Sequence, residues 1–161
     1  MGVASAFACA EELEGELTKE LARARGERHA LKSLDTVKIE EHAQERRDFQ
    51  ERAETLQLRL RDLLHLAARE LGIPEEGAEG VVSQLARAGS AGAQIAFAVK
   101  KVGALATTLS QVNTFNQLLA ERALSVTRAY VRALSPRPAA YDRRGAESTY
   151  ASAVGSVSRR A

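Results

Sequence analysis

The sequence is poor in the residues that build β-structure, disulfide bonds and ligand pockets. It has 161 residues, with one cysteine, three prolines, no tryptophan and 4% aromatic residues. Valine and isoleucine together number 14, against 30 alanines and 19 leucines. Sheets favour β-branched and aromatic side chains, and small-molecule pockets are often lined by aromatic ones. These shortages argue against a β-sandwich, a β-barrel, a disulfide scaffold or a rich ligand pocket.

Motifs for catalysis and metal binding are also missing. The single Cys9 cannot form an internal disulfide bond, and His29, His42 and His65 lack the spacing of zinc ligands. The sequence contains no phosphate-binding glycine loop, dinucleotide-binding motif or nucleophile elbow. Its carboxylates alternate with lysine and arginine at helical spacing, which is typical of solvated helix faces. We therefore expect no enzyme activity, no cofactor and no metal site.

No segment has the pattern of a signal peptide or of a membrane span. The first apolar stretch has no basic region before it, and acidic residues follow it directly. The most apolar window, residues 91–109, is interrupted by Lys100 and Lys101. The net charge is +2, and the basic excess of residues 76–161 is mild, whereas a nucleic-acid-binding surface usually carries a concentrated basic patch. We expect a cytoplasmic protein with no stable membrane insertion and no nucleic-acid partner.

A long helical periodicity is the main positive feature of the sequence. Apolar residues recur every three or four positions in three stretches, so each stretch is predicted to be a helix. Asp35 or Thr36 is expected to cap the second helix, and Gly72 to end it. The three predicted helices are residues 4–34, 37–71 and 91–134.

The arrangement of these stretches predicts the fold class and the domain organisation. Residues 75–88 fit a short helix, and the alternative for residues 75–92 is a hinge. The prediction is an all-α fold, with an elongated, antiparallel, three-helix, coiled-coil-like bundle in residues 1–134. Residues 135–161 lack a strong period and are rich in Ala, Ser, Gly and Arg, so they are expected to form a flexible C-terminal tail.

The third predicted helix is nearly free of charge. Between Val81 and Ala120 the only charged residues are Arg87, Lys100 and Lys101. A helix that is apolar or neutral around most of its circumference is usually buried on more than one side. Two interpretations stay open. Either this helix lies between the other two, or one of its faces is left for a partner.

Residues 109–145 carry several features in a fixed order. An asparagine pair is followed by an apolar helical run, a proline-marked stop and a tyrosine with a glycine four residues later. These features are Asn113 and Asn116, the run from Leu118 to Leu134, and Tyr141 with Gly145. In order and spacing they resemble the third helix and tail of the FlgN-like flagellar export chaperones. Two charged amphipathic helices joined by a turn with Asp35 also resemble the plan of that family.

The resemblance implies a function. Members of the family bind hook–filament junction (hook-associated) proteins in the cytoplasm, prevent their premature assembly and deliver them to a component of the flagellar type III export gate. The residues implied to bind the client are Asn116, Leu119, Val126, Tyr130 and Leu134. Tyr141 is the residue implied to dock at the export gate. For the apolar residues among them, packing within the chain is the alternative.

Two other functions fit the same pattern of long amphipathic helices. One is a structural coiled-coil protein that associates with itself through the third helix, as a homodimer. The other is a different helical secretion chaperone with the same hairpin design.

Overall fold

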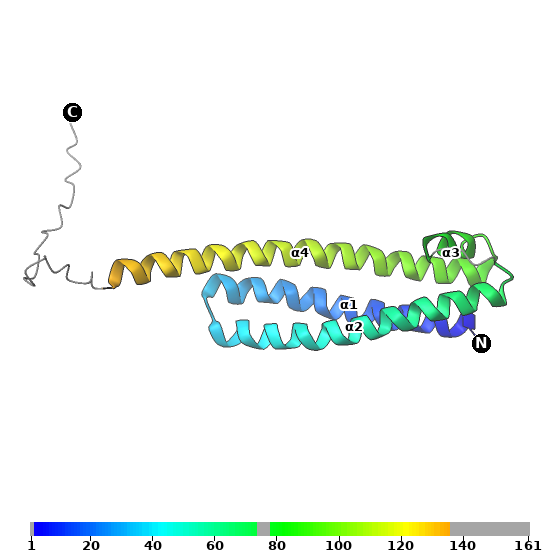
Figure 1. The fold of residues 1–161 in the computed structure, drawn as a ribbon, viewed down its shortest axis with the longest axis horizontal. Helices are drawn as coiled ribbons and strands as arrows, with labels where there is room; N and C mark the ends of the chain where they lie inside the picture. Colours follow the sequence, from blue (N-terminus) through cyan, green and yellow to red (C-terminus); the bar gives the residue numbers. More distant parts are fainter. Residues whose placement is uncertain (1, 74–77, 136–161) are drawn as a thin grey trace, which may run out of the picture. The chain divides into compact units, whose positions relative to one another are not determined.

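The computed structural model describes residues 2–73 and 78–135, and these residues form four α-helices (Figure 1). The helices are α1 (Gly2–Ser33), α2 (Thr36–Glu70), α3 (Ala78–Leu85) and α4 (Ser90–Leu134). The described residues contain no strand, which confirms the all-helical prediction for them. The chain divides into two compact units, Met1–Ser125 and Val126–Ala161. The predicted boundary at residue 134 and the predicted coiled-coil-like packing stay predictions, and the predicted flexible tail lies almost wholly outside the described residues.

The connection between α1 and α2 is short and has a defined cap. Asp35 is the N-cap of α2, and its carboxylate accepts a hydrogen bond of 3.2 Å from the backbone N–H of Lys38. Such a bond satisfies one of the N–H groups that the first turn of a helix leaves unpaired. Leu34, just before the cap, has a positive φ of 54°, which reverses the chain between the two helices. Of the two capping candidates, the structure therefore uses Asp35.

The far end of α2 is closed by a glycine turn. Gly72 has a φ of +69°, and its N–H donates to the carbonyl of Arg69 at 3.1 Å. The N–H of Ile73 donates to the carbonyl of Ala68 at 2.9 Å. These two bonds form the Schellman motif that a glycine just after a helix end favours. The sequence left residues 75–92 open as either helix or hinge. In the described part of this segment α3 is a helix, and α4 begins at Ser90.

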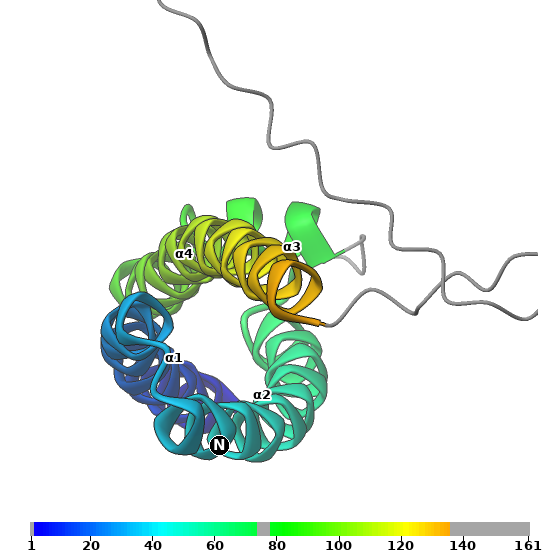
Figure 2. The ribbon, with the colours of Figure 1, turned by 90° about the vertical axis from the view of Figure 1, so that its left-hand side faces the viewer.

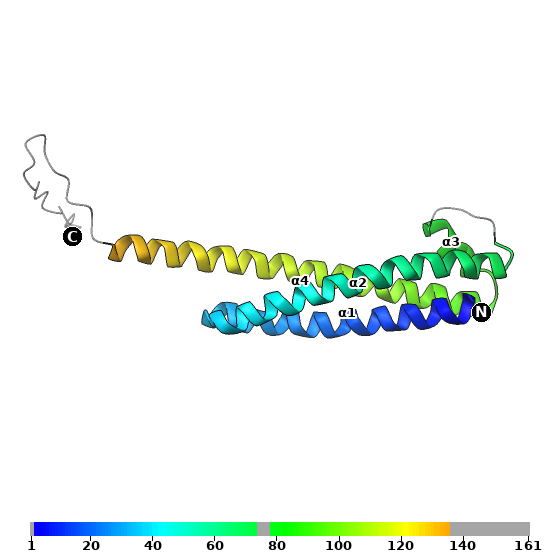
Figure 3. The same ribbon diagram turned by 60° about the horizontal axis from the view of Figure 1, so that its bottom comes forward.

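Polar contacts fix the antiparallel pairing of α1 and α2. Several ion pairs join the helices, and in three of them the residue number rises along α1 while it falls along α2. These pairs are Glu12 with Arg59, Glu16 with Arg52, and Glu27 with Arg46. At the other end of the pair, the carboxylate of Glu70 accepts hydrogen bonds from the N–H groups of Gly2 and Val3, at 2.7 and 3.1 Å. The two helices consequently lie side by side along their length (Figures 1 and 3).

The apolar core of the first unit lies between α1, α2 and the first part of α4. Viewed along the helices, these three surround a common centre rather than forming a single layer (Figure 2). Each contributes a stripe of buried residues spaced by three or four positions, as the periodicity predicts. The larger members of the core are Leu13, Leu17, Leu21, Phe49, Leu56, Leu60, Leu64, Ile95 and Leu109. Val81 and Leu85 of α3 are buried against the same cluster, with exposed fractions of 1% and 0%.

Within the first unit α4 is not buried on more than one side. Phe97, Phe115 and Leu118 keep exposed fractions of 65%, 46% and 52%. The helix with the most buried positions is α1, although it is far more charged. The interpretation that placed the third long helix between the other two is therefore wrong. Alanine, serine, threonine and glutamine make a low-charge surface that is stable in water, so a lack of charge does not require burial.

Candidate partner-binding surface

Asn116 is a buried polar residue on the α4 face that packs against α1. Its exposed fraction is 3%. The side-chain amide donates one hydrogen bond to the backbone carbonyl of Ala24 at 2.7 Å and another to the Glu27 carboxylate at 2.8 Å. A buried amide without partners would be costly, so these bonds hold α4 in one register against α1. The structure thus places Asn116 in a contact inside the chain.

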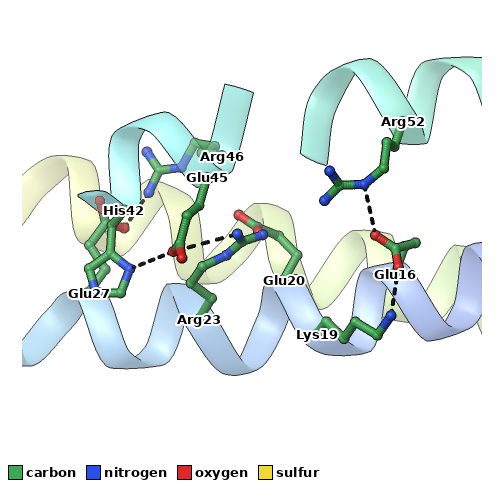
Figure 4. A network of polar contacts seen from close by, with 9 residues as sticks. All are labelled: Glu16, Lys19, Glu20, Arg23, Glu27, His42, Glu45, Arg46 and Arg52. Carbon is green, nitrogen blue, oxygen red and sulfur yellow. Dashed lines mark hydrogen bonds and ion pairs between the residues drawn. The ribbon is translucent and has the colours of Figure 1, made fainter. Parts of the chain in front are cut away.

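Glu27 connects that contact to α2. Only 6% of this residue is exposed, and its carboxylate also pairs with the guanidinium of Arg46 (Figure 4). One buried carboxylate therefore receives donors from both α2 and α4. A buried charge is tolerated only when it is paired and hydrogen-bonded, and Glu27 meets both conditions.

A second polar cluster lies next to Glu27 on α1 and α2. Glu20 is 2% exposed and pairs with Arg23, one turn along α1. The guanidinium of Arg23 also lies 3.5 Å from the carboxylate of Glu45, which in turn lies 3.5 Å from Nδ1 of His42 (Figure 4). This chain of groups links the two helices through their polar side chains. We assign it a structural role.

Glu16 forms the other polar bridge between α1 and α2. Its carboxylate accepts hydrogen bonds from Lys19 at 2.8 Å and from Arg52 at 3.1 Å (Figure 4). The hydrogen bond from Lys19, followed by that from Arg52, lowers the pKa of Glu16 below its ordinary value of 4.5. The charged form of this carboxylate is therefore favoured in the folded protein.

The last turns of α4 expose an apolar face. In the second unit the described residues are 126–135, and Val126, Tyr130 and Leu134 have exposed fractions of 54%, 67% and 81%. Their four-residue spacing puts them on one side of the helix. Leu119, in the first unit, is half-buried. Tyr141, the residue implied to dock at the export gate, lies outside the described residues.

Two features of α4 were not anticipated from the sequence. The first is a contact between the Arg28 guanidinium and the ring of Phe115, whose centroid lies 4.4 Å away. The second is a groove of about 710 Å³ between α2 and α4, with Leu17 of α1 at its floor. Uncharged amides on both walls, such as Gln50 and Asn113, are the sequence signal that could have indicated the groove.

Other kinds of site have no support in the described part of the chain. Within residues 2–73 and 78–135, no group of three His, Cys, Asp or Glu side chains is arranged to hold a metal ion. None of the helices in these two ranges has an apolar stretch sufficient to span a lipid bilayer. Cys9 is a free, buried cysteine whose thiol has its pKa raised by burial.

Comparison with known sequences and structures gave one match. The sequence model of the FlgN family, described as FlgN protein, matches residues 11–149, which is most of the chain. No curated protein and no solved structure matches it. The matched region includes α2, α3, α4, most of α1 and the asparagine pair.

Proposed function

The chain belongs to the FlgN family of flagellar export chaperones, and from that membership we propose a specific task for it. In this proposal it binds hook–filament junction subunits in the cytoplasm, prevents their premature assembly and delivers them to the flagellar export gate. The observation that carries the proposal is the exposed apolar face of Val126, Tyr130 and Leu134.

That face suits a client segment that folds when it binds. An amphipathic helix can lay its apolar side against a matching helix face, and burying apolar area contributes about 25 cal/mol per Å². If the client segment is disordered when free, ordering it opposes binding and keeps the affinity moderate. The bound segment is then unavailable for assembly but is still released at the gate.

The remaining predicted site residues take different parts in the proposal. Leu119, in the first unit, is half-buried, and we propose that its exposed portion also contacts the client. Asn116 has its amide occupied by α1, so we propose that it positions α4 rather than touching the client. Tyr141 keeps its proposed role at the export gate, which rests on the resemblance of the tail motif alone.

A single substitution with a neighbouring control tests the client face. Val126→Asp puts a charge on the exposed apolar face, whereas Ser125→Asp adds the same charge at an exposed position on another side of α4. We expect Val126→Asp to weaken binding of a purified hook–filament junction subunit about tenfold or more, as for a central apolar contact of an interface. Ser125→Asp is expected to change the affinity less than about twofold. The measurement is isothermal titration calorimetry on the full chain.

Both variants should keep the helix content of the parent in circular dichroism, because both positions are exposed. Equal affinities for the two variants would place the client elsewhere on the molecule. A loss of helix content in Val126→Asp alone would show that this residue stabilises the fold.

A further inference from the structure

Polar side chains from α1, α2 and α4 interrupt the packing of the first unit. Glu27 connects the three helices, because its carboxylate receives donors from Arg46 of α2 and from Asn116 of α4. The neighbouring polar groups lie in residues 23–28 of α1, 42–46 of α2 and 113–116 of α4 (Figure 4). Together they form a polar layer, which consists of Arg23, Glu27, Arg28, His42, Glu45, Arg46, Asn113 and Asn116.

The two sides of the polar layer differ in how much apolar surface they bury. On one side lies the apolar core, with members such as Leu13, Leu60 and Ile95. On the other side the buried residues in the described part of the chain are Ala30 and Leu31, and neither belongs to that core. No residue of α2 before Phe49 is buried, and none of the described residues after Asn116 is.

The helical stretches beyond the polar layer are short. Within the first unit they are residues 29–33 of α1, 36–41 of α2 and 117–125 of α4, which together form the distal part. Helices shorter than about 12 residues are marginal in water unless tertiary packing supports them. All three stretches are shorter than that, and they share little buried apolar surface. The distal part therefore depends on the polar layer for its attachment.

The polar layer itself is incompletely hydrogen-bonded. Within residues 2–73 and 78–135, every buried side-chain nitrogen or oxygen without a hydrogen-bond partner belongs to it. These atoms are Nε of Arg23, Arg28 and Arg46, Nδ1 of His42, and Oδ1 of Asn113 and Asn116. Unsatisfied buried groups cost free energy, and water satisfies them when the helices separate. Separation also returns the charges of Glu27 and Arg46 to water, which offsets part of the loss of their ion pair.

We propose that the first unit opens reversibly at the polar layer in one cooperative step. In the open state the polar layer and the distal part are separated and unfolded, whereas the apolar core stays packed. The opening breaks the bonds from Asn116 to α1, releases α4 up to Ser125 and uncovers Leu31. It is a property of the free chain and does not depend on the proposed client.

Amide hydrogen exchange of the full chain, followed by mass spectrometry at increasing urea concentrations, tests the proposal. Two segments of α2 are compared, residues 36–47 at the polar layer and beyond it and residues 53–68 in the apolar core. We expect residues 36–47 to exchange at least about tenfold faster. Their rate should also rise less steeply with urea, because the local opening exposes less surface than global unfolding. Equal rates and equal slopes would overturn the proposal.

A substitution in the apolar core distinguishes local opening from global unfolding. Leu60 is 6% exposed, and Leu60→Ala weakens the core in the closed state and in the open state alike. We expect residues 53–68 to exchange at least about tenfold faster in this variant and residues 36–47 to change less than about twofold. If Leu60→Ala does not fold, the milder Ile95→Val should give the same pattern with a smaller increase. Equal acceleration of both segments would show that the first unit unfolds in one step.

A substitution in α4 tests whether the opening is cooperative between helices. Asn116 makes its hydrogen bonds to α1, so separate fraying of α2 would not respond to its loss. We expect Asn116→Leu to speed the exchange of residues 36–47 of α2 at least about fivefold. The control Gln111→Leu, at an exposed position, should change it less than about twofold. An effect of Asn116→Leu confined to α4, or equal effects of both substitutions on α2, would show that the helices fray separately.

Discussion

Asn116 introduces hydrogen-bond donors into the contact between α1 and α4. Both donor bonds go to α1, one to a backbone carbonyl and one to a carboxylate that Arg46 also holds. Apolar contacts alone permit a helix to slide by one turn, because leucine and alanine pack in several registers. A buried amide with fixed partners removes that freedom. We therefore regard Asn116 as the residue that sets where α4 lies along α1.

Replacing this amide tests its role. We expect Asn116→Leu to lower the free energy of unfolding by about 1–3 kcal/mol, because Glu27 and the carbonyl of Ala24 lose a donor while they stay buried. Gln111→Leu, at an exposed position on the same helix, is the matched control and should change it by less than about 0.5 kcal/mol. Urea unfolding followed by circular dichroism measures both values. An equal effect of the two substitutions would mean that the hydrogen bonds of Asn116 contribute nothing.

The bridge at Glu16 predicts a pH dependence. Because the folded pKa of this carboxylate lies below 4.5, its contribution to stability is present above the pKa of the unfolded chain and is lost as the pH falls below about that value. Glu16→Gln removes this contribution. We expect the variant to be less stable than the parent at neutral pH, with the difference shrinking as the pH is lowered below 4.5. Urea midpoints measured from pH 7 to pH 3 give the comparison, and a pH-independent difference would contradict the interpretation.

At the scale of the helices, the positions where helices begin and end were easier to predict from the sequence than which of their sides are buried. Asp35 caps the start of α2 through its carboxylate, and the turn at Gly72 ends the helix through backbone hydrogen bonds. The local sequence determines both, and both residues act as it suggests. Which side of α4 is buried depends instead on which other helices pack against it. Its alanines, serines and threonines are compatible with burial and with exposure, so periodicity alone did not decide between them.

The contact between α3 and α4 depends on a glycine. A methyl group at Gly92 would overlap the backbone carbonyl of Leu85, whereas one at Gly103 meets nothing within 4 Å. We expect Gly92→Ala to destabilise the protein by about 1–3 kcal/mol, because α3 must move away from α4. Gly103→Ala should stabilise it by about 0.5–1 kcal/mol through helix propensity. Thermal unfolding of both variants distinguishes them, and a stabilising Gly92→Ala would contradict the close approach.

For the whole molecule, the class of function was easier to predict from the sequence than the residues that form the functional surfaces. The order of Asn113, Asn116 and the following apolar run pointed to the FlgN family, and the family match over residues 11–149 confirms that membership. This stretch of α4, from the asparagine pair to the end of the run, contains both buried and exposed residues, since Asn116 is 3% exposed and Leu134 is 81% exposed. Both positions have the same helical period, so only the presence or absence of a packing partner separates them.

The central claim is that the last turns of α4 hold a flagellar client, and site-specific photocrosslinking tests it most directly. In one variant of the full chain a photoreactive phenylalanine replaces Tyr130. In a control variant it replaces Arg128, which is exposed on another side of the same helix. Both are mixed with a purified hook–filament junction subunit and irradiated. The account predicts a crosslink from position 130 to a terminal segment of that subunit, and little product from position 128. Crosslinks from position 130 only to a second copy of this chain would contradict the account and favour the self-associating coiled coil.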